Sequence, residues 1–220
     1  MGGITMSGNA SLTIQGNGTD KSNLTVTAGD NDSYASMVGI GSADNSTCGN
    51  IKIDRVSLTV SGGNSWQYGA AAIGTSAINS QCGDIVVINS SVKAAGANGA
   101  AAIGLGYSYR ESYVKCGKID ISSSLIEATI KDDCGDGIYG ACIGLCIERS
   151  YVSYECGFIT ITCDNESDFL SNLKYNPSEW TDLNYKIGRG FRPLNNTPAS
   201  LVFTGGTFNG KSFTDGYGKW

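Results

Sequence analysis

Short runs of alternating apolar and polar residues recur along the chain, and residues 1–160 show no helical period. One recurring phrase consists of small residues and ends in Ile-Gly. Strict alternation predicts strands with one face buried and one face exposed. The phrase occurs at residues 37–41, 69–74, 99–104 and 140–144.

A second phrase, Cys-Gly-x-Ile-x-Ile or a close variant, follows each copy of the first. Its cysteines are Cys48, Cys82, Cys116 and Cys156, which are 34, 34 and 40 residues apart. A third apolar pair follows ten and twelve positions after each of the first three cysteines. The fourth copy breaks there, with acidic residues instead. The pairs are Leu58 and Val60, Val92 and Ala94, and Ile126 and Ala128, and the break is at Glu166 and Asp168.

Three short alternating runs per unit, with glycine at the corners, are typical of one turn of a parallel β-helix. We therefore predict an all-β solenoid with three short strands per turn and about 30–40 residues per turn. Equivalent residues of successive turns would lie about 4.8 Å apart in columns. Two such columns are predicted in the interior: Ile40, Ile73, Ile103 and Ile143, and Ile51, Ile85, Ile119 and Ile159.

The whole chain, residues 1–220, is predicted to form one β-helix domain, because the pattern resumes near both ends. Residues 164–198 are less regular and contain all three prolines. We interpret this segment as an insertion or as a cap over the exposed edge of an end coil.

Repeats of this type resemble the Gly/Ile-rich tandem repeats of bacterial surface and secreted proteins, which have a right-handed, pectin-lyase-like β-helix. The resemblance covers residues 1–162 and 185–210, although Cys-Gly stands where a glycine is the usual corner. It implies a right-handed solenoid. It does not single out an activity, because that superfamily contains lyases, hydrolases, carbohydrate binders, phage tail spikes and adhesins.

Composition excludes several classes of function. The chain has 31 glycines, 3 prolines, no histidine and a net charge of −5. A basic nucleic-acid footprint, a histidine-based triad and a histidine-ligated zinc site are therefore all absent. No run of 18 apolar residues predicts a membrane span, and we expect no membrane insertion. We expect an extracellular or cell-surface protein whose natural chain extends beyond Met1, since residues 1–6 already resemble repeat sequence.

Eight cysteines raise the question of disulfides. Four belong to the column of the second phrase, where parallel Cβ vectors favour a ladder of buried free thiols over bridges. One or two disulfides among the cysteines near loops, or a structural zinc, are the alternatives. The loop cysteines are Cys134, Cys142, Cys146 and Cys163.

Two consecutive turns carry longer loops, at residues 107–113 and 148–155, which stacking would place side by side. Aromatic rings beside carboxylates and guanidinium groups are suited to sugars, whose C–H faces stack on rings and whose hydroxyls donate to carboxylates and accept from guanidinium groups. Ordinary surface tyrosines and ion pairs are the alternative. The candidate ligand-binding residues are Tyr107, Tyr109, Arg110, Glu111, Tyr113, Glu148, Arg149, Tyr151 and Tyr154.

A loop at residues 132–137 holds three carboxylates among glycines. Asp132, Asp133 and Asp136 could hold Ca²⁺, or they could form a solvated acidic turn. We expect no other cofactor.

Eight Asn-x-Ser/Thr sequons are glycosylation acceptors or a product of composition. They begin at Asn9, Asn17, Asn23, Asn31, Asn45, Asn89, Asn165 and Asn195.

Three functional hypotheses remain at this point. The first is a non-enzymatic extracellular module for adhesion or carbohydrate binding, with a glycan or a host surface as partner. The second is a polysaccharide lyase or glycoside hydrolase that uses Arg110 or Arg149 with nearby carboxylates. The third is a structural spacer without a ligand.

Overall fold

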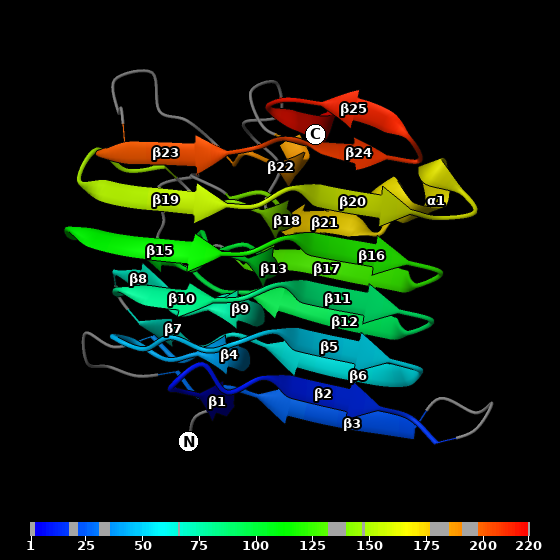
Figure 1. Ribbon diagram of the computed structural model, residues 1–220, viewed down its shortest axis with the longest axis horizontal. Coiled ribbons are helices and arrows are strands. Elements are labelled where there is room, and N and C mark those ends of the chain that lie inside the picture. Colours follow the sequence, from blue (N-terminus) through cyan, green and yellow to red (C-terminus); the bar gives the residue numbers. More distant parts are fainter. Residues whose placement is uncertain are drawn as a thin grey trace.

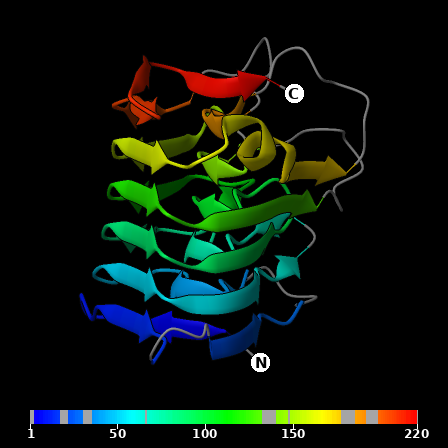
Figure 2. The ribbon, with the colours of Figure 1, turned by 90° about the vertical axis from the view of Figure 1, so that its right-hand side faces the viewer.

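The computed structural model describes residues 3–17, 22–30, 36–65, 67–131, 140–146, 148–176, 185–190 and 198–219. The chain climbs as a stack of coils, from the N-terminus at the bottom of Figure 1 to the C-terminus at the top. Strands of successive coils pair in parallel and in register, and Figure 2 shows the same stack from the side. The predicted fold class, a parallel β-helix, is confirmed.

The first sheet carries the Ile-Gly phrase. Ile103 pairs with Ile73 on one side and with Ile143 on the other, so the predicted isoleucine column is continuous and fully buried. All pairings in this sheet are parallel except the last, between β22 and β26. Its strands, in spatial order, are β1 (Ile4–Met6), β4 (Ile40–Ser42), β9 (Ile73–Thr75), β13 (Ile103–Gly104), β18 (Ile143–Gly144), β22 (Tyr185–Gly188) and β26 (Gly216–Lys219).

The second sheet carries the run after each Cys-Gly corner. Its inward isoleucines are buried, as the second predicted column requires. Its outward positions Lys52, Val86, Asp120 and Thr160 form one row, because each pairs with the next. The strands are β2 (Leu12–Gln15), β5 (Ile51–Asp54), β11 (Ile85–Ile88), β16 (Ile119–Ser122), β20 (Ile159–Thr162), β24 (Gly206–Phe208) and β25 (Lys211–Phe213).

The third sheet contains the third apolar pair of each unit. Where the pattern breaks, the short helix α1 (Glu166–Ser171) begins, with Asn165 as its N-cap: the side chain of Asn165 accepts a hydrogen bond from the backbone N–H of Asp168. The chain then returns to the sheet as β21, so that Leu173 pairs with Ala128. The strands are β3 (Ser22–Thr27), β6 (Val56–Ser61), β12 (Ser91–Gly96), β17 (Leu125–Lys131) and β21 (Leu173–Asn176).

The structure adds a fourth strand to several coils, which in three of them ends at the cysteine of the second phrase. These strands are rich in serine and other polar residues, so their hydrophobic alternation is weak, and the sequence pattern of three runs did not include them. A small antiparallel sheet forms beside them. The parallel strands are β10 (Ser80–Cys82), β15 (Ser112–Cys116), β19 (Val152–Cys156) and β23 (Ser200–Phe203), and the antiparallel ones are β7 (Asn64–Ser65), β8 (Tyr68–Gly69) and β14 (Tyr107–Ser108).

The glycine of the Ile-Gly phrase has a backbone conformation that side chains rarely allow. Gly74 and Gly104 have φ of +134°, and Gly144 has φ of +121°. A Cβ at Gly104 would overlap the carbonyl oxygen of Gly144 in the next coil, and one at Gly74 would overlap that of Gly104. Each repeat therefore needs glycine for both its dihedral angle and its close contact with the coil above.

Several coil corners carry asparagine with positive φ. Asn9, Asn45 and Asn89, each the first residue of a sequon, have φ of 62°, 55° and 52°. Asparagine tolerates this left-handed region better than most residues. The backbone thus gives a structural reason for these three asparagines.

The two ends of the solenoid differ. At the N-terminal end, β1, β2 and β3 are the outermost strands of their sheets. At the C-terminal end, β25 and β26 fold back and pair antiparallel with the last parallel strands. The rings of Phe208 and Tyr217 stack there, 4.7 Å apart. This end is therefore covered by the chain's own final strands.

Candidate functional site

The two tyrosine-rich loops lie side by side on the wall formed by β15 and β19. Ser112 pairs with Val152 and Tyr113 with Ser153, so the two segments keep the register of the coils. The prediction that stacking joins these loops is confirmed. Arg110 and Glu111 lie at the exposed tip of the first loop, whose turn is fixed by the Ser108 hydroxyl donating to the Arg110 carbonyl oxygen at 3.0 Å.

An exposed aromatic pair marks the centre of this surface. The rings of Tyr109 and Tyr151, one from each loop, lie 6.4 Å apart in an edge-to-face arrangement. Both side chains are exposed, at 43% and 41%. The guanidinium group of Arg149 lies 5.2 Å from the centre of the Tyr109 ring, within cation–π range. Two exposed rings and one partly buried cation thereby lie together on this surface.

Two buried phenols hold Arg149 in place. Its Nε donates to the hydroxyl of Tyr107 at 3.0 Å, and its backbone N–H donates to the hydroxyl of Tyr154 at 2.9 Å. Burial raises the pKa of Tyr154 well above its usual value, so this phenol stays neutral. The predicted ligand residues Tyr107 and Tyr154 therefore lie inside the wall, where they support the surface.

A polar rim borders the aromatic pair. The Tyr113 hydroxyl donates to Glu155 at 2.6 Å, and Lys115 forms an ion pair with the same carboxylate at 2.6 Å. Partial burial and the Glu155 hydrogen bond raise the pKa of Tyr113 to about 12. The hydrogen bond from Lys115 is the largest cause that lowers the pKa of Glu155, and the hydrogen bond from Tyr113 lowers it further. A hollow of about 380 Å³ opens beside this rim, lined by Asn79, Glu111, Ser112, Tyr113, Tyr151 and Ser153.

Glu148 lies in the interior. Its side chain is fully buried, and both carboxylate oxygens accept hydrogen bonds from Arg189, each at 2.7 Å. Arg189 also reaches Asp215 at 3.4 Å, next to β26. Glu148 thus ties its coil to the next coil and to the C-terminal strands, and is not placed to touch a ligand. Arg189 was not singled out in the sequence, because a lone arginine in an irregular segment gives no signal of a partner 41 residues away.

The predicted calcium loop cannot be compared with the structure, because Asp132, Asp133 and Asp136 lie outside the described residues. Within the ranges that are described, no three metal-ligating side chains come together. Asp120 lies on the outward row of the second sheet, opposite Val86 and Thr160.

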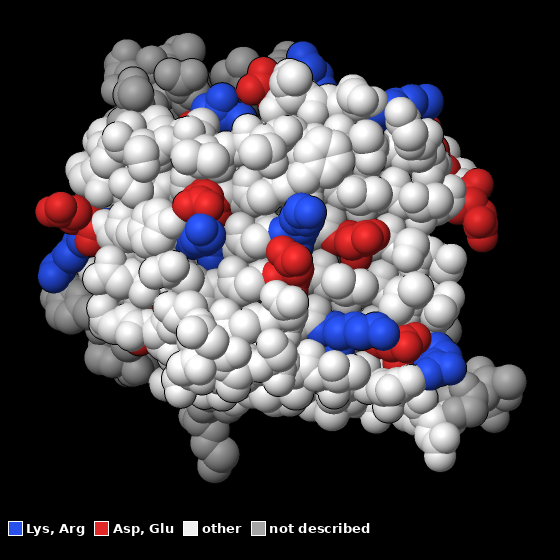
Figure 3. All heavy atoms as spheres, in the orientation of Figure 1, with Lys and Arg blue, Asp and Glu red and all other residues white. Residues whose placement is uncertain are grey.

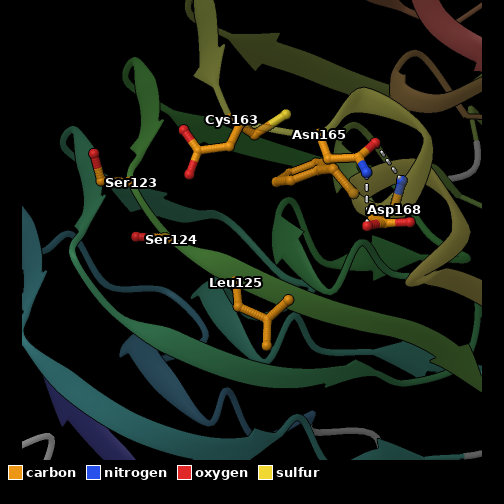
Figure 4. Close-up of a pocket in the computed structure, with 8 residues that line it drawn as sticks. Ser123, Ser124, Leu125, Cys163, Asn165 and Asp168 are labelled. Carbon is orange, nitrogen blue, oxygen red and sulfur yellow. Dashed lines mark hydrogen bonds between the residues drawn. The ribbon is translucent and has the colours of Figure 1, made fainter.

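A second hollow, of about 280 Å³, lies between the corner before β17 and the start of α1 (Figure 4). The sequence did not predict it. Its polar groups mostly serve the local fold: Asn165 and Asp168 bond to each other at the helix start, and the Ser124 hydroxyl donates to the Ser122 carbonyl oxygen. Burial raises the pKa of the Cys163 thiol, so this cysteine is not an activated nucleophile.

Comparison of the chain with protein-family models, with curated proteins and with solved structures gives no match. In the described part of the chain, no helix has the length and hydropathy needed to span a bilayer. On the face shown in Figure 3, acidic and basic side chains lie close to one another among wide uncharged areas. Neither sign of charge dominates that face.

Proposed function

We propose that the chain is a non-enzymatic extracellular β-helix module that binds carbohydrate through the surface around Tyr109 and Tyr151, and so mediates adhesion. The observation that carries this proposal is the exposed edge-to-face pair of these two rings with Arg149 held against one of them. Contiguous exposed apolar groups with a polar rim are typical of interaction sites.

The chemistry of the surface suits a sugar. The rings offer apolar faces to C–H groups, while Arg149, Glu111 and the Glu155 rim offer charged partners for hydroxyls. The ligand surface we propose consists of Tyr109, Tyr113, Tyr151, Arg149, Arg110 and Glu111. Its groups come from paired strands and a hydrogen-bonded loop, so little conformational entropy is lost on binding.

The extracellular location and the right-handed, pectin-lyase-like assignment belong to this proposal as well. They are supported by the resemblance of the repeats to bacterial surface proteins. The parallel coils agree with it. Catalysis of polysaccharide cleavage is less favoured. Glu148 is next to Arg149 in the sequence, but both of its carboxylate oxygens already accept hydrogen bonds from Arg189.

The experiment is a glycan array followed by titration of the best ligand. Tyr109→Ala, Tyr151→Ala and Arg149→Ala should each weaken binding about tenfold or more, since a buried aromatic or arginine anchor contributes at least ~1.4 kcal/mol. Phe158→Ala is the matched control, because Phe158 is also exposed but lies outside this surface.

Three outcomes separate the hypotheses. Binding that is lost in the three variants and kept in the control supports the proposal. If the chain releases reducing or unsaturated sugars from an acidic polysaccharide, and Arg149→Ala abolishes this release, the enzyme hypothesis replaces the binding proposal. If no glycan binds on the array and the variants attach to cells as the wild type does, the structural-spacer hypothesis is the one that remains.

A further inference from the structure

Four cysteines form one interior column of the solenoid. Cys82, Cys116 and Cys156 pair in register through β10, β15 and β19. Cys48 continues the column, because its backbone N–H donates to Gln81 and its carbonyl oxygen accepts from Gly83. All four thiols are buried, and none of the seven cysteines that the structure describes is in a disulfide.

The thiols of this column fall into two pairs. The sulfurs of Cys116 and Cys156 are 3.4 Å apart. Cys48 and Cys82 are neighbours in register, and the interaction between their thiols lowers the pKa of Cys48 and raises that of Cys82. Cys82 also has Cys116 as its neighbour on the other side of the column. Because the 3.4 Å contact joins Cys116 to Cys156, Cys48 is the column neighbour that remains for Cys82.

The distances are compatible with bridges inside each pair. Adjacent strands are about 4.8 Å apart, which lies within the Cα separation of about 4.4–6.8 Å found in disulfides. In-register parallel Cβ vectors do not by themselves aim the sulfurs at one another. The 3.4 Å contact shows that the side chains of Cys116 and Cys156 nevertheless turn toward each other. A bridge also needs the two Cβ atoms to approach to about 3.5–4.5 Å, so the adjoining strands must draw slightly closer at the cysteines.

We propose that Cys48 and Cys82, and separately Cys116 and Cys156, form two disulfides between successive coils when the chain folds in the presence of a small-molecule disulfide such as oxidised glutathione. Each disulfide would link one coil covalently to the next. The proposal is independent of the carbohydrate surface.

The reaction is thiol–disulfide exchange. The thiolate of the first cysteine attacks the small disulfide, forms a mixed disulfide and releases one small thiolate. The second cysteine, after losing its proton, attacks the protein sulfur of that mixed disulfide and releases the second small thiolate. Two protein thiols are oxidised, and one small disulfide is reduced to two thiolates, which take up the two protons that the protein thiols lose.

The timing of the exchange follows from burial. Because all four thiols are closed to solvent in the finished column, exchange must take place before the coils close over it.

The test uses the full chain, refolded from denaturant with a reduced and oxidised glutathione couple. Thiols are alkylated in denaturant without reductant, and the intact mass and tryptic peptides are measured. We expect four of the eight cysteines to escape alkylation. Trypsin cuts after Lys52 and Lys118, so the two members of each pair lie on different peptides and a cross-linked peptide identifies each bridge.

Variants make the assignment specific. Cys48→Ser should lose only the first bridge and Cys116→Ser only the second. Cys163→Ser is the matched control that should keep both; it also removes the other cysteine from the tryptic peptide that contains Cys156. Eight alkylated thiols in the refolded wild type, a Cys82–Cys116 link, or bridges to Cys146 would each overturn the proposal.

Discussion

Replacing Gly104 with alanine tests the glycine column that repeats through the first sheet. Gly104 has φ of +134° and lies directly below Gly144. An added Cβ would come within 3.0 Å of the Gly144 carbonyl oxygen, closer than Cβ atoms in proteins are found. The three nearest atoms all belong to the backbone of Gly144, so no flexible side chain can move away to make room.

The expected cost has two parts. A non-glycine residue in this backbone region is strained by ~1–3 kcal/mol. Forcing a methyl group into a closely packed interior adds ~1–3 kcal/mol through displacement of the coil above. We therefore expect Gly104→Ala to lower the free energy of unfolding by about 4 kcal/mol, a large share of the 5–15 kcal/mol typical of a folded domain. At this chain length that corresponds to a fall in Tm of ~8–16 °C.

Gly8→Ala is the matched control. Gly8 also has a positive φ, of 63°, but a Cβ there meets nothing within 4 Å. Alanine at Gly8 should cost only the left-handed strain, about 1 kcal/mol. Both variants are compared with the wild type by urea denaturation and by thermal unfolding followed by circular dichroism. If Gly104→Ala and Gly8→Ala differ by less than about 1 kcal/mol, the close stacking of the coils at Gly104 is wrong.

Three further predictions concern the wall and the corners. Glu148→Gln should lower the free energy of unfolding by about 2 kcal/mol in urea titrations, because Arg189 loses a buried ionic partner; an unchanged midpoint would contradict the burial of this pair. The pKa of Tyr113 is about 12 in the fold against 10.0 for the free side chain, so its contribution to stability is complete below pH 10 and is lost as the pH rises through 12. Absorbance titration should show this late ionisation, and Glu155→Gln should move it to lower pH, although burial will keep part of the shift. At the corner residue Asn89, with φ of 52°, replacement by alanine should cost about 1 kcal/mol in thermal unfolding, whereas replacement by glycine should cost little.

Much of the architecture could be predicted from the sequence because the solenoid repeats its interactions at fixed sequence intervals. Ile103 lies between Ile73 and Ile143 because each turn places the same phrase at the same point of the coil. The strand from Ser112 to Cys116 was missed, since its polar residues hide the alternation. α1 was missed too, although Asn165 followed by Asp168 is a recognisable helix start.

The site was harder to predict, because burial of a charged side chain depends on partners distant in sequence. Glu148 was expected at the surface, where isolated carboxylates usually lie. Arg189 comes from the next coil and makes its full burial tolerable. Similarly, the sequence does not tell that Tyr107, which lies in β14, is buried, whereas Tyr109, which follows the end of that strand, is exposed.

The stacking of β15 on β19 has a dimensional consequence. Groups displayed by successive coils on this wall repeat at the interstrand step of about 4.8 Å, whatever the side chains are. An elongated polymer lying parallel to the solenoid axis would thus meet binding groups at regular intervals. Exchanging outward residues in neighbouring coils would change the chemical group at each position while the spacing between positions stayed constant.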